Sequence, residues 1–166
     1  MKNRFSVQRM TRIAVVAAAY VALTLLLSFL AYGDIQFRVS EMLMLLCFFN
    51  PDYGIALSIG CVISNCFSPF AVLDVPVGTA ATVLAACLMW KSKRLWVASL
   101  YPVLCNAVLV GLELSVIYGL PMLATMGSVA IGEFTVVTVL GLPVFSLLRR
   151  NPVFMRAIQA RDHALR

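Results

Sequence analysis

The sequence predicts an all-α integral membrane protein, a compact bundle of about six transmembrane helices with both termini on the cytoplasmic side. Of its 166 residues, 62% are hydrophobic and only 12% are charged, which is outside the usual range of soluble domains. Many of the apolar residues fall in runs approaching the ~20 residues that a helix needs to cross a bilayer. The length suits one transmembrane domain over residues 1–166, with a short basic N-terminal segment at 1–11 and a basic tail at 149–166.

Six apolar segments are separated by polar residues, proline or glycine. We expect helices at residues 12–32, 40–49, 53–67, 74–90, 95–118 and 125–148. The second and third are short, and "FFNPDYG" between them contains Asn-Pro and Gly, so they are expected to form a tight helical hairpin that does not cross the full membrane. The first segment is longer than the apolar part of a signal peptide and more spans follow, so we expect it to be retained.

The basic residues predict the orientation. All but Arg38 fall in three groups, which precede the first segment, follow the fourth and follow the sixth: Lys2, Arg4, Arg9 and Arg12; Lys91, Lys93 and Arg94; Arg149, Arg150, Arg156, Arg161 and Arg166. Six helices place the three groups on one side, and the positive-inside rule makes that side cytoplasmic. The net charge of +6 therefore reflects topology, and we expect no nucleic-acid partner. The tail at 151–166 fits either a short helix lying on an anionic inner leaflet or a disordered segment.

The five cysteines are interpreted as small buried apolar residues. Cys47, Cys61, Cys66, Cys87 and Cys105 form no CxxC pair, and none is near the single histidine in the sequence. We therefore expect no metal site, no disulfide and no cofactor.

Polar residues at membrane depth are candidate functional groups, because each is costly unless it faces a partner or a cavity. On the expected topology, five lie in the outer half of the bundle and a sixth lies near mid-membrane: Glu41, Asn65, Asp74, Glu113 and Glu133, then Asn106. The inner halves of the helices carry almost no charge. This distribution predicts a binding pocket open to the outside and closed below, and it argues against a channel.

Most of these residues also have a structural interpretation. Asp74 fits the N-cap of its helix, and Glu41 fits either a pair with Arg38 or a cap of the helix that begins near residue 40. Asn65 and Asn106 fit hydrogen bonds between helices.

Structural interpretations are weaker for the two remaining glutamates. No Lys or Arg is expected at the depth of Glu113 and Glu133, so a carboxylate pair there favours a cationic ligand or one with several donors.

The stretch "GDIQFRVSE", residues 33–41, places Asp34, Gln36, Arg38 and Glu41 between two apolar segments. Its alternating apolar and polar residues predict an extended strip with one apolar side down, on the outer face, as a lid over the site. Arg38 is then explained by a pair with Glu41 or by a substrate carbonyl, and the alternative is an ordinary loop.

The first segment carries Ala14, Ala18 and Ala22 at i, i+4 and i+8. Small residues at this spacing make a smooth stripe against which another helix packs closely. The stripe fits packing within the bundle as well as contact with a partner.

Several motifs together resemble the QueT family, over about residues 9–150. They are "IQFRVSE" (35–41), "NCFSP" with "LDVPVGTAAT" (65–82), "NAVLVGLEL" (106–114) and "IGEFTVVTVLGLPV" (131–144), together with six helices in a short chain and the alanine stripe. Members of this family are substrate-binding S components of energy-coupling factor (ECF) transporters, assigned to the uptake of queuosine precursors.

The resemblance implies a small-molecule substrate and protein partners. The substrate would be a deazaguanine, such as 7-aminomethyl-7-deazaguanine, 7-cyano-7-deazaguanine or queuine, bound from the outside within the lipid bilayer. The partners would be a transmembrane T component, in contact with Ala14, Ala18 and Ala22, and two cytoplasmic ATPase subunits. This chain has no Walker motif, so ATP hydrolysis is expected in the partners, and the chain is not expected to be an enzyme.

The chemistry of a deazaguanine suits the candidate residues. A guanine-like edge offers two adjacent donors that one carboxylate accepts, and an oxygen that an amide or an arginine serves. We expect Glu113 and Glu133 to be the ligand carboxylates, with one on the edge and the second free for an aminomethyl cation. The other predicted substrate-binding residues are Asn106, Asn65, Glu41, Arg38, Phe37 and Asp74, with Phe37 stacking on the ring or simply filling an apolar interface.

Three other functions fit parts of the sequence. The first is an S component for another vitamin or nucleobase. The second is a small membrane enzyme, in which two glutamates do acid/base work, although the single histidine, His163, lies in the tail. The third is an assembly or scaffold protein, which rests on the alanine stripe alone.

Overall fold

The computed structural model describes residues 6–31 and 37–160, which form helices joined by turns with no β-strand among them. Four helices are long and apolar enough to cross a membrane: α1 (Val7–Leu26), α5 (Ala71–Lys91), α6 (Leu95–Tyr118) and the continuous helix Met122–Leu148. The prediction of an all-α membrane bundle is therefore confirmed.

The expected short hairpin is also present. It consists of the 3₁₀-helix η1 (Val39–Leu45), α3 (Leu46–Phe49) and α4 (Asp52–Asn65), with the break at Asn50 and Pro51. Fourteen residues of α4 span about 21 Å, less than the ~30 Å of a bilayer core. All four residues of α3 are buried, so this part of the hairpin lies inside the protein and needs no membrane-spanning length.

The last apolar segment is one helix with a change of winding. It comprises α7 (Met122–Glu133), a π-helical stretch η2 (Phe134–Gly141) and α8 (Leu142–Leu148). Pro143, which lacks a backbone N–H, lies just after the return to α geometry. π-helical turns are frequent at functional sites, and here Glu133 is the residue directly before one.

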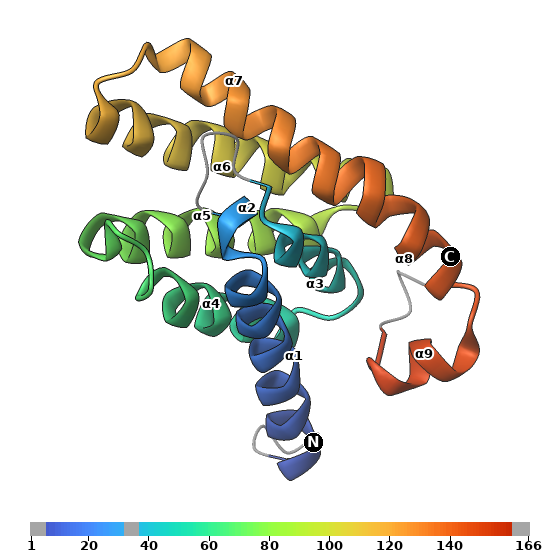
Figure 1. The fold of residues 1–166 in the computed structure, drawn as a ribbon. Coiled ribbons are helices and arrows are strands. Elements are labelled where there is room, and N and C mark those ends of the chain that lie inside the picture. The colour runs from blue at the N-terminus through green and yellow to red at the C-terminus, as the bar shows by residue number, and fades with distance from the viewer. Residues whose placement is uncertain (1–5, 32–36, 161–166) are drawn as a thin grey trace.

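The elements pack in a simple order. α1 packs on α4, α4 on α5, α5 on α6 and α6 on α7 (Figure 1). η1 packs on α1, α6 and η2. At the α6–α7 contact a Cβ added to Gly111 would lie 2.8 Å from the Cα of Met126, so glycine allows these two backbones to approach. The buried core runs through the bundle around η1 and α3.

Part of the C-terminal tail folds back onto the hairpin. After α8, helix α9 (Pro152–Ala157) brings the Ile158 carbonyl to the side chains of Asn50 and Tyr53, with both donor–acceptor distances 3.2 Å. Phe145 on α8 contacts both Phe49 and Phe154. Residues 152–160 are therefore an ordered extension of the bundle, and the interpretation of this part as disordered is wrong. Residues 161–166 lie outside the described residues.

Three other expectations need correction. The first helix runs from residue 7 to 26 rather than 12 to 32, because its first turns are helical without being apolar, and the short α2 (Ser28–Ala31) follows it. α5 begins at Ala71 rather than residue 74. Cys66 and Cys87 are exposed on the apolar surface, whereas the other three cysteines are buried. Hydropathy identifies the membrane part of a helix, but it does not show which face points inward.

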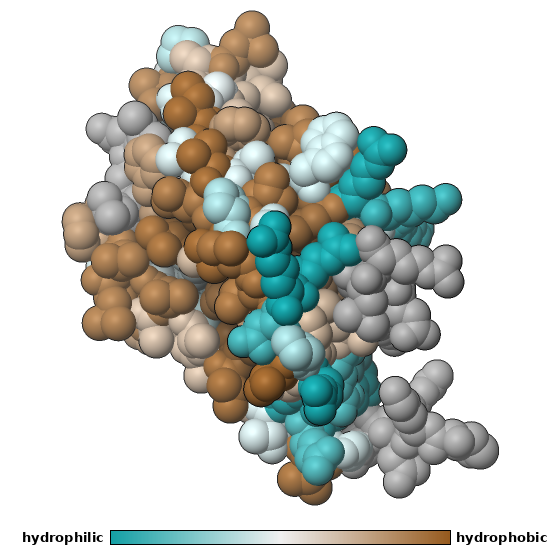
Figure 2. All heavy atoms as spheres, turned by 90° about the vertical axis from the view of Figure 1, so that its right-hand side faces the viewer, coloured by the Kyte–Doolittle hydropathy of each residue, from teal (hydrophilic) through white to brown (hydrophobic). Residues whose placement is uncertain are grey.

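The surface separates apolar from hydrophilic residues. Figure 2 shows hydrophilic side chains gathered to one side of a broad apolar surface. The exposed residues of the basic groups that follow α5 and α8 are Lys91, Lys93, Arg94, Arg150 and Arg156. A broad apolar surface of this kind suits contact with lipid.

Candidate functional site

The centre of the site is Arg38, which the sequence placed in a lid. It is 7% exposed and interacts electrostatically with Glu41, Glu133 and Glu113. The expectation that no basic residue lies near Glu113 and Glu133 is therefore wrong. The reason is that the chain from residue 37 turns into the bundle, and Val39 to Leu45 form a helix instead of an extended strip.

The lid prediction is only partly within the described residues. Asp34 and Gln36 lie outside them. Phe37 is half-buried and packs on the hydrophobic core, and Ser40 and Glu41 are buried. The described part of this stretch is thus an inner wall of the site.

Glu41 is held by α1. The Tyr20 hydroxyl donates a hydrogen bond to Glu41 Oε1, and one turn further along α1 the hydroxyls of Thr24 and Ser40 lie 2.6 Å apart. Glu41 Oε2 is buried without a hydrogen-bond partner. The cap interpretation of Glu41 is wrong, because η1 has no side-chain cap. Its predicted pairing with Arg38 agrees with the electrostatic contact.

Glu133 lies next to the same arginine. It ends α7, it is 5% exposed, and Asn106 on α6 provides a side-chain hydrogen bond to it. Glu41 and Arg38 are its electrostatic neighbours, and its Oε2 atom has no hydrogen-bond partner. Asn106 therefore joins two helices, as its structural interpretation predicted, and it also fixes one oxygen of Glu133.

Asp74 and Glu113 form a second cluster of carboxyl groups. The Glu113 side chain is within hydrogen-bonding range of the Asp74 side chain, and Asp74 Oδ2 accepts a hydrogen bond from the Ser68 hydroxyl. Glu113 is 8% exposed, and its Oε1 atom is buried without a hydrogen-bond partner. The sequence paired Glu113 with Glu133, but in the structure its closest acidic neighbour is Asp74. Asp74 is also not an N-cap, because α5 begins three residues earlier and Phe70 occupies the cap position.

Asn65 supports this second cluster. Its Nδ2 atom donates a 2.7 Å hydrogen bond to the Asp74 backbone carbonyl, and it also lies 3.4 Å from the Cys61 sulfur. The Oδ1 atom is buried with no hydrogen-bond partner. Gly78 makes room for the amide, because a Cβ there would lie 2.5 Å from Asn65 Nδ2. The predicted role of Asn65 as a link between helices is confirmed.

Two site residues were missed by the sequence reasoning. Tyr20 and Ser68 each donate to a predicted carboxyl group. Tyr20 could have been recognised from the sequence, because tyrosine normally lies at the membrane interface and this one lies in the middle of an apolar helix. It shares the buried face of α1 with Ala17 and Thr24. Ser68 had none, because serine is common in turns.

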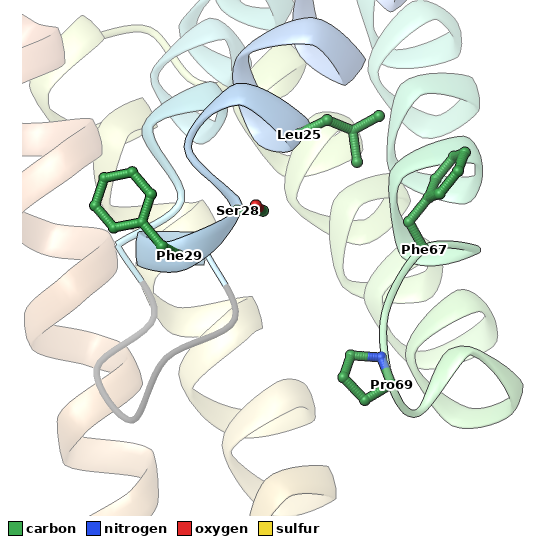
Figure 3. A pocket seen from close by; sticks show the side chains of 5 residues that line it. All are labelled: Leu25, Ser28, Phe29, Phe67 and Pro69. Atoms are coloured by element: carbon green, nitrogen blue, oxygen red, sulfur yellow. The ribbon is translucent and has the colours of Figure 1, made fainter.

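An open surface pocket of about 510 Å³ contains none of the predicted site residues. It is lined by Leu25, Ser28, Phe29, Phe67 and Pro69. Figure 3 shows Leu25 and Ser28, from α1 and α2, across from Phe67 and Pro69 in the α4–α5 turn. Three of the lining residues are sequence neighbours of the polar clusters: Leu25 follows Thr24, and Phe67 and Pro69 lie on either side of Ser68.

The alanine stripe lies on the opposite face of α1. Ala14, Ala18 and Ala22 are all exposed, whereas Tyr20 and Thr24 on the other face are buried. The interpretation that the stripe packs inside the bundle is therefore wrong. The stripe is accessible to a lipid or a partner helix.

A cluster of buried carboxyl, amide and guanidinium groups inside apolar helices is typical of membrane proteins that transport solutes, protons or ions. The chain belongs to the QueT transporter family, which matches residues 10–150. It is similar to the queuosine precursor transporter QueT of Lactococcus lactis subsp. cremoris (strain MG1363), with 41% identity over 138 residues, 74% of this chain and 81% of the relative. No solved structure matches it. The predicted family and the multi-pass membrane location are thus confirmed.

Proposed function

We propose that this chain is the substrate-binding S component of an ECF transporter and that it captures a queuosine precursor, a 7-deazaguanine, from outside the cell. The family and the name of the Lactococcus relative support a queuosine precursor as the substrate class. The observation that carries the proposal is the set of buried carboxyl oxygens without hydrogen-bond partners on Glu41, Glu113 and Glu133, close to Arg38.

These groups complement a deazaguanine. Its N1–H and exocyclic amine need a carboxylate acceptor, and its carbonyl oxygen needs a donor. Glu133 offers an open acceptor oxygen, while Arg38 and Asn106 offer N–H donors beside it. We therefore assign the guanine-like edge to Glu133, with Glu41 next to it. Unpaired buried acceptors are expensive, so a ligand that supplies several donors at once gains much of its affinity here.

The orientation follows from the basic groups. The basic groups at the start of the chain and the first turns of α1, at the junction of α5 and α6, and after α8 face the cytoplasm in this proposal. The α4–α5 turn and the start of α5, with Ser68 and Asp74, then lie toward the outside, where the substrate enters.

The T component is proposed to dock on the exposed alanine face of α1, because small residues allow a second helix to approach closely. Energy for release inside is supplied by two ATPase subunits of the partner complex. Replacing Ala14, Ala18 and Ala22 by leucine is expected to abolish uptake and co-purification with the T component, with substrate binding retained. Loss of binding as well would assign the stripe to the integrity of the bundle instead.

The substrate assignment is tested by binding to the purified protein in detergent or nanodiscs. Titration calorimetry with 7-aminomethyl-7-deazaguanine, 7-cyano-7-deazaguanine and queuine is expected to give saturable binding at micromolar concentration or below for at least one of them. Guanine, riboflavin and biotin serve as controls. Saturable binding of a control heterocycle, with none of the deazaguanines bound, would reassign the protein to another substrate.

A further inference from the structure

The two carboxyl clusters differ in what balances their charge. Glu41 and Glu133 have Arg38 as a direct electrostatic partner. For Glu113, the strongest electrostatic neighbour is another acid, Asp74, and Arg38 contributes less.

Two carboxylates in contact repel each other unless a proton or a cation lies between them. The side chains that donate to Asp74 are uncharged: Ser68 donates to its carboxyl group, and Asn65 donates to its backbone carbonyl. The cation that acts on Glu113, Arg38, is shared with Glu41 and Glu133. Glu113 Oε1 has no hydrogen-bond partner although more than nine-tenths of the residue is buried. One guanidinium serves several carboxyl groups here, and an ammonium group supplies further positive charge together with three N–H donors.

We propose that Asp74 and Glu113 form an ammonium subsite, which makes the protein selective for a deazaguanine whose 7-substituent is a primary amine. Glu133, with Arg38 and Asn106, reads the guanine-like edge, and the Asp74–Glu113 pair binds the aminomethyl nitrogen. This assignment rests on the proposed function, since it divides the roles of one substrate site between two clusters.

The location of the pair supports a role in selection. Asp74 lies in the first turn of α5 and is only half-buried, next to the exposed Val72 and Leu73. Glu113 is deeper, on the buried face of α6. An incoming substrate therefore meets the acidic pair at the end of the bundle where α5 begins, and a cationic substituent is attracted there before the ring reaches Glu133.

The test compares two ligands that differ in charge and little else: 7-aminomethyl-7-deazaguanine and the neutral 7-hydroxymethyl-7-deazaguanine. Calorimetry on the wild-type protein is expected to show the amine binding more tightly by about tenfold or more, equivalent to ~1.4 kcal/mol. Glu113→Gln and Asp74→Asn are expected to remove this preference by weakening the amine about tenfold while changing the hydroxymethyl ligand by less than about threefold.

Glu133→Gln is the matched control, because it is another buried glutamate and is assigned to the ring edge. It is expected to weaken both ligands by the same factor. Thermal unfolding and size-exclusion chromatography check that each variant is folded, and Asp74→Asn provides the second variant if Glu113→Gln is unstable.

The outcomes separate the two proposals. Equal affinity of the wild-type protein for both ligands, or an equal loss for both ligands in Glu113→Gln and Asp74→Asn, overturns the ammonium subsite and leaves the deazaguanine assignment intact. Binding of neither ligand overturns the subsite if 7-cyano-7-deazaguanine or queuine still binds. If none of these deazaguanines binds to the wild-type protein, the proposed function is overturned as well.

Discussion

The hydroxyl of Tyr20 donates a hydrogen bond to Glu41, so a helix with an exposed alanine face also holds an acidic group of the buried site. Both side chains are buried, at 0% and 2% exposure. The bond fixes Oε1 of Glu41 and leaves Oε2 for another donor. We infer that Tyr20 positions Glu41 for the substrate.

Tyr20→Phe is expected to weaken substrate binding. Hydrogen bonds to charged groups contribute about 1.5–3 kcal/mol, which corresponds to roughly tenfold to hundredfold in affinity. Calorimetric titration measures the change. Tyr53→Phe is the matched control, because Tyr53 is also buried and its hydroxyl donates to the tail carbonyl of Ile158, outside both carboxyl clusters. An equal effect of both substitutions would mean that Tyr20 acts through general stability.

Arg38→Ala is expected to impair both binding and stability. Removing one partner of a buried charge network costs about 3–5 kcal/mol, and here it leaves Glu41, Glu113 and Glu133 without their shared cation. Thermal unfolding in nanodiscs and ligand titration give the two readouts. Arg94→Ala, which removes an exposed basic residue, is expected to change neither. Wild-type affinity in Arg38→Ala would show that the arginine has no part in the site.

Gly78→Ala is expected to displace the Asn65 amide, because the new Cβ would lie 2.5 Å from Nδ2. Overpacking of this kind costs about 1–3 kcal/mol, and we expect a lower unfolding temperature together with weaker ligand binding. Gly127→Ala is a suitable comparison, since its Cβ meets no atom within 4 Å. Alanine there should be neutral or stabilising by up to ~1 kcal/mol. A neutral Gly78→Ala would contradict the close packing described.

Asn50→Ala is expected to release the C-terminal segment. Asn50 donates to the carbonyls of Ile158 and Gln159, each at 3.2 Å, and its Oδ1 accepts from the Asp52 backbone. Faster hydrogen exchange in residues 152–160, measured by mass spectrometry, is the expected result. Ser58→Ala, which removes a bond within α4, should leave exchange in the tail unchanged. Unaltered exchange in both variants would show that aromatic packing alone holds α9.

The sequence predicted the membrane helices well, because their signal is local. The helix expected at 95–118 has these bounds in the structure, and the short hairpin was recognised from its Asn-Pro break. Arg38 was misplaced for a different reason. Hydropathy and the positive-inside rule both place an isolated arginine in an outer loop. Neither criterion takes account of contacts between distant residues, such as those of Arg38 with Glu41 and Glu133 inside the bundle.

The candidate residues were identified better than their pairing. Each predicted polar residue is in or beside the two clusters, because buried charge is rare enough in a membrane helix to stand out. Which carboxyl group meets which depends on helix rotation and on the start of α5. A start at Ala71 turns Asp74 toward Glu113 instead of leaving it at a helix cap.

The bonds of Tyr20 and Thr24 to residues of η1 have a mechanical consequence. Tyr20 and Thr24 lie one turn apart on α1 and form hydrogen bonds with two adjacent residues, Glu41 and Ser40. Sliding α1 along its axis by a single residue would break both bonds at once, whereas tilting α1 and η1 together preserves them. The two bonds therefore favour joint movement of α1 and η1. The distance between spin labels placed at Ala19 and at an exposed position on α5 would report such a movement when a solute is loaded or released.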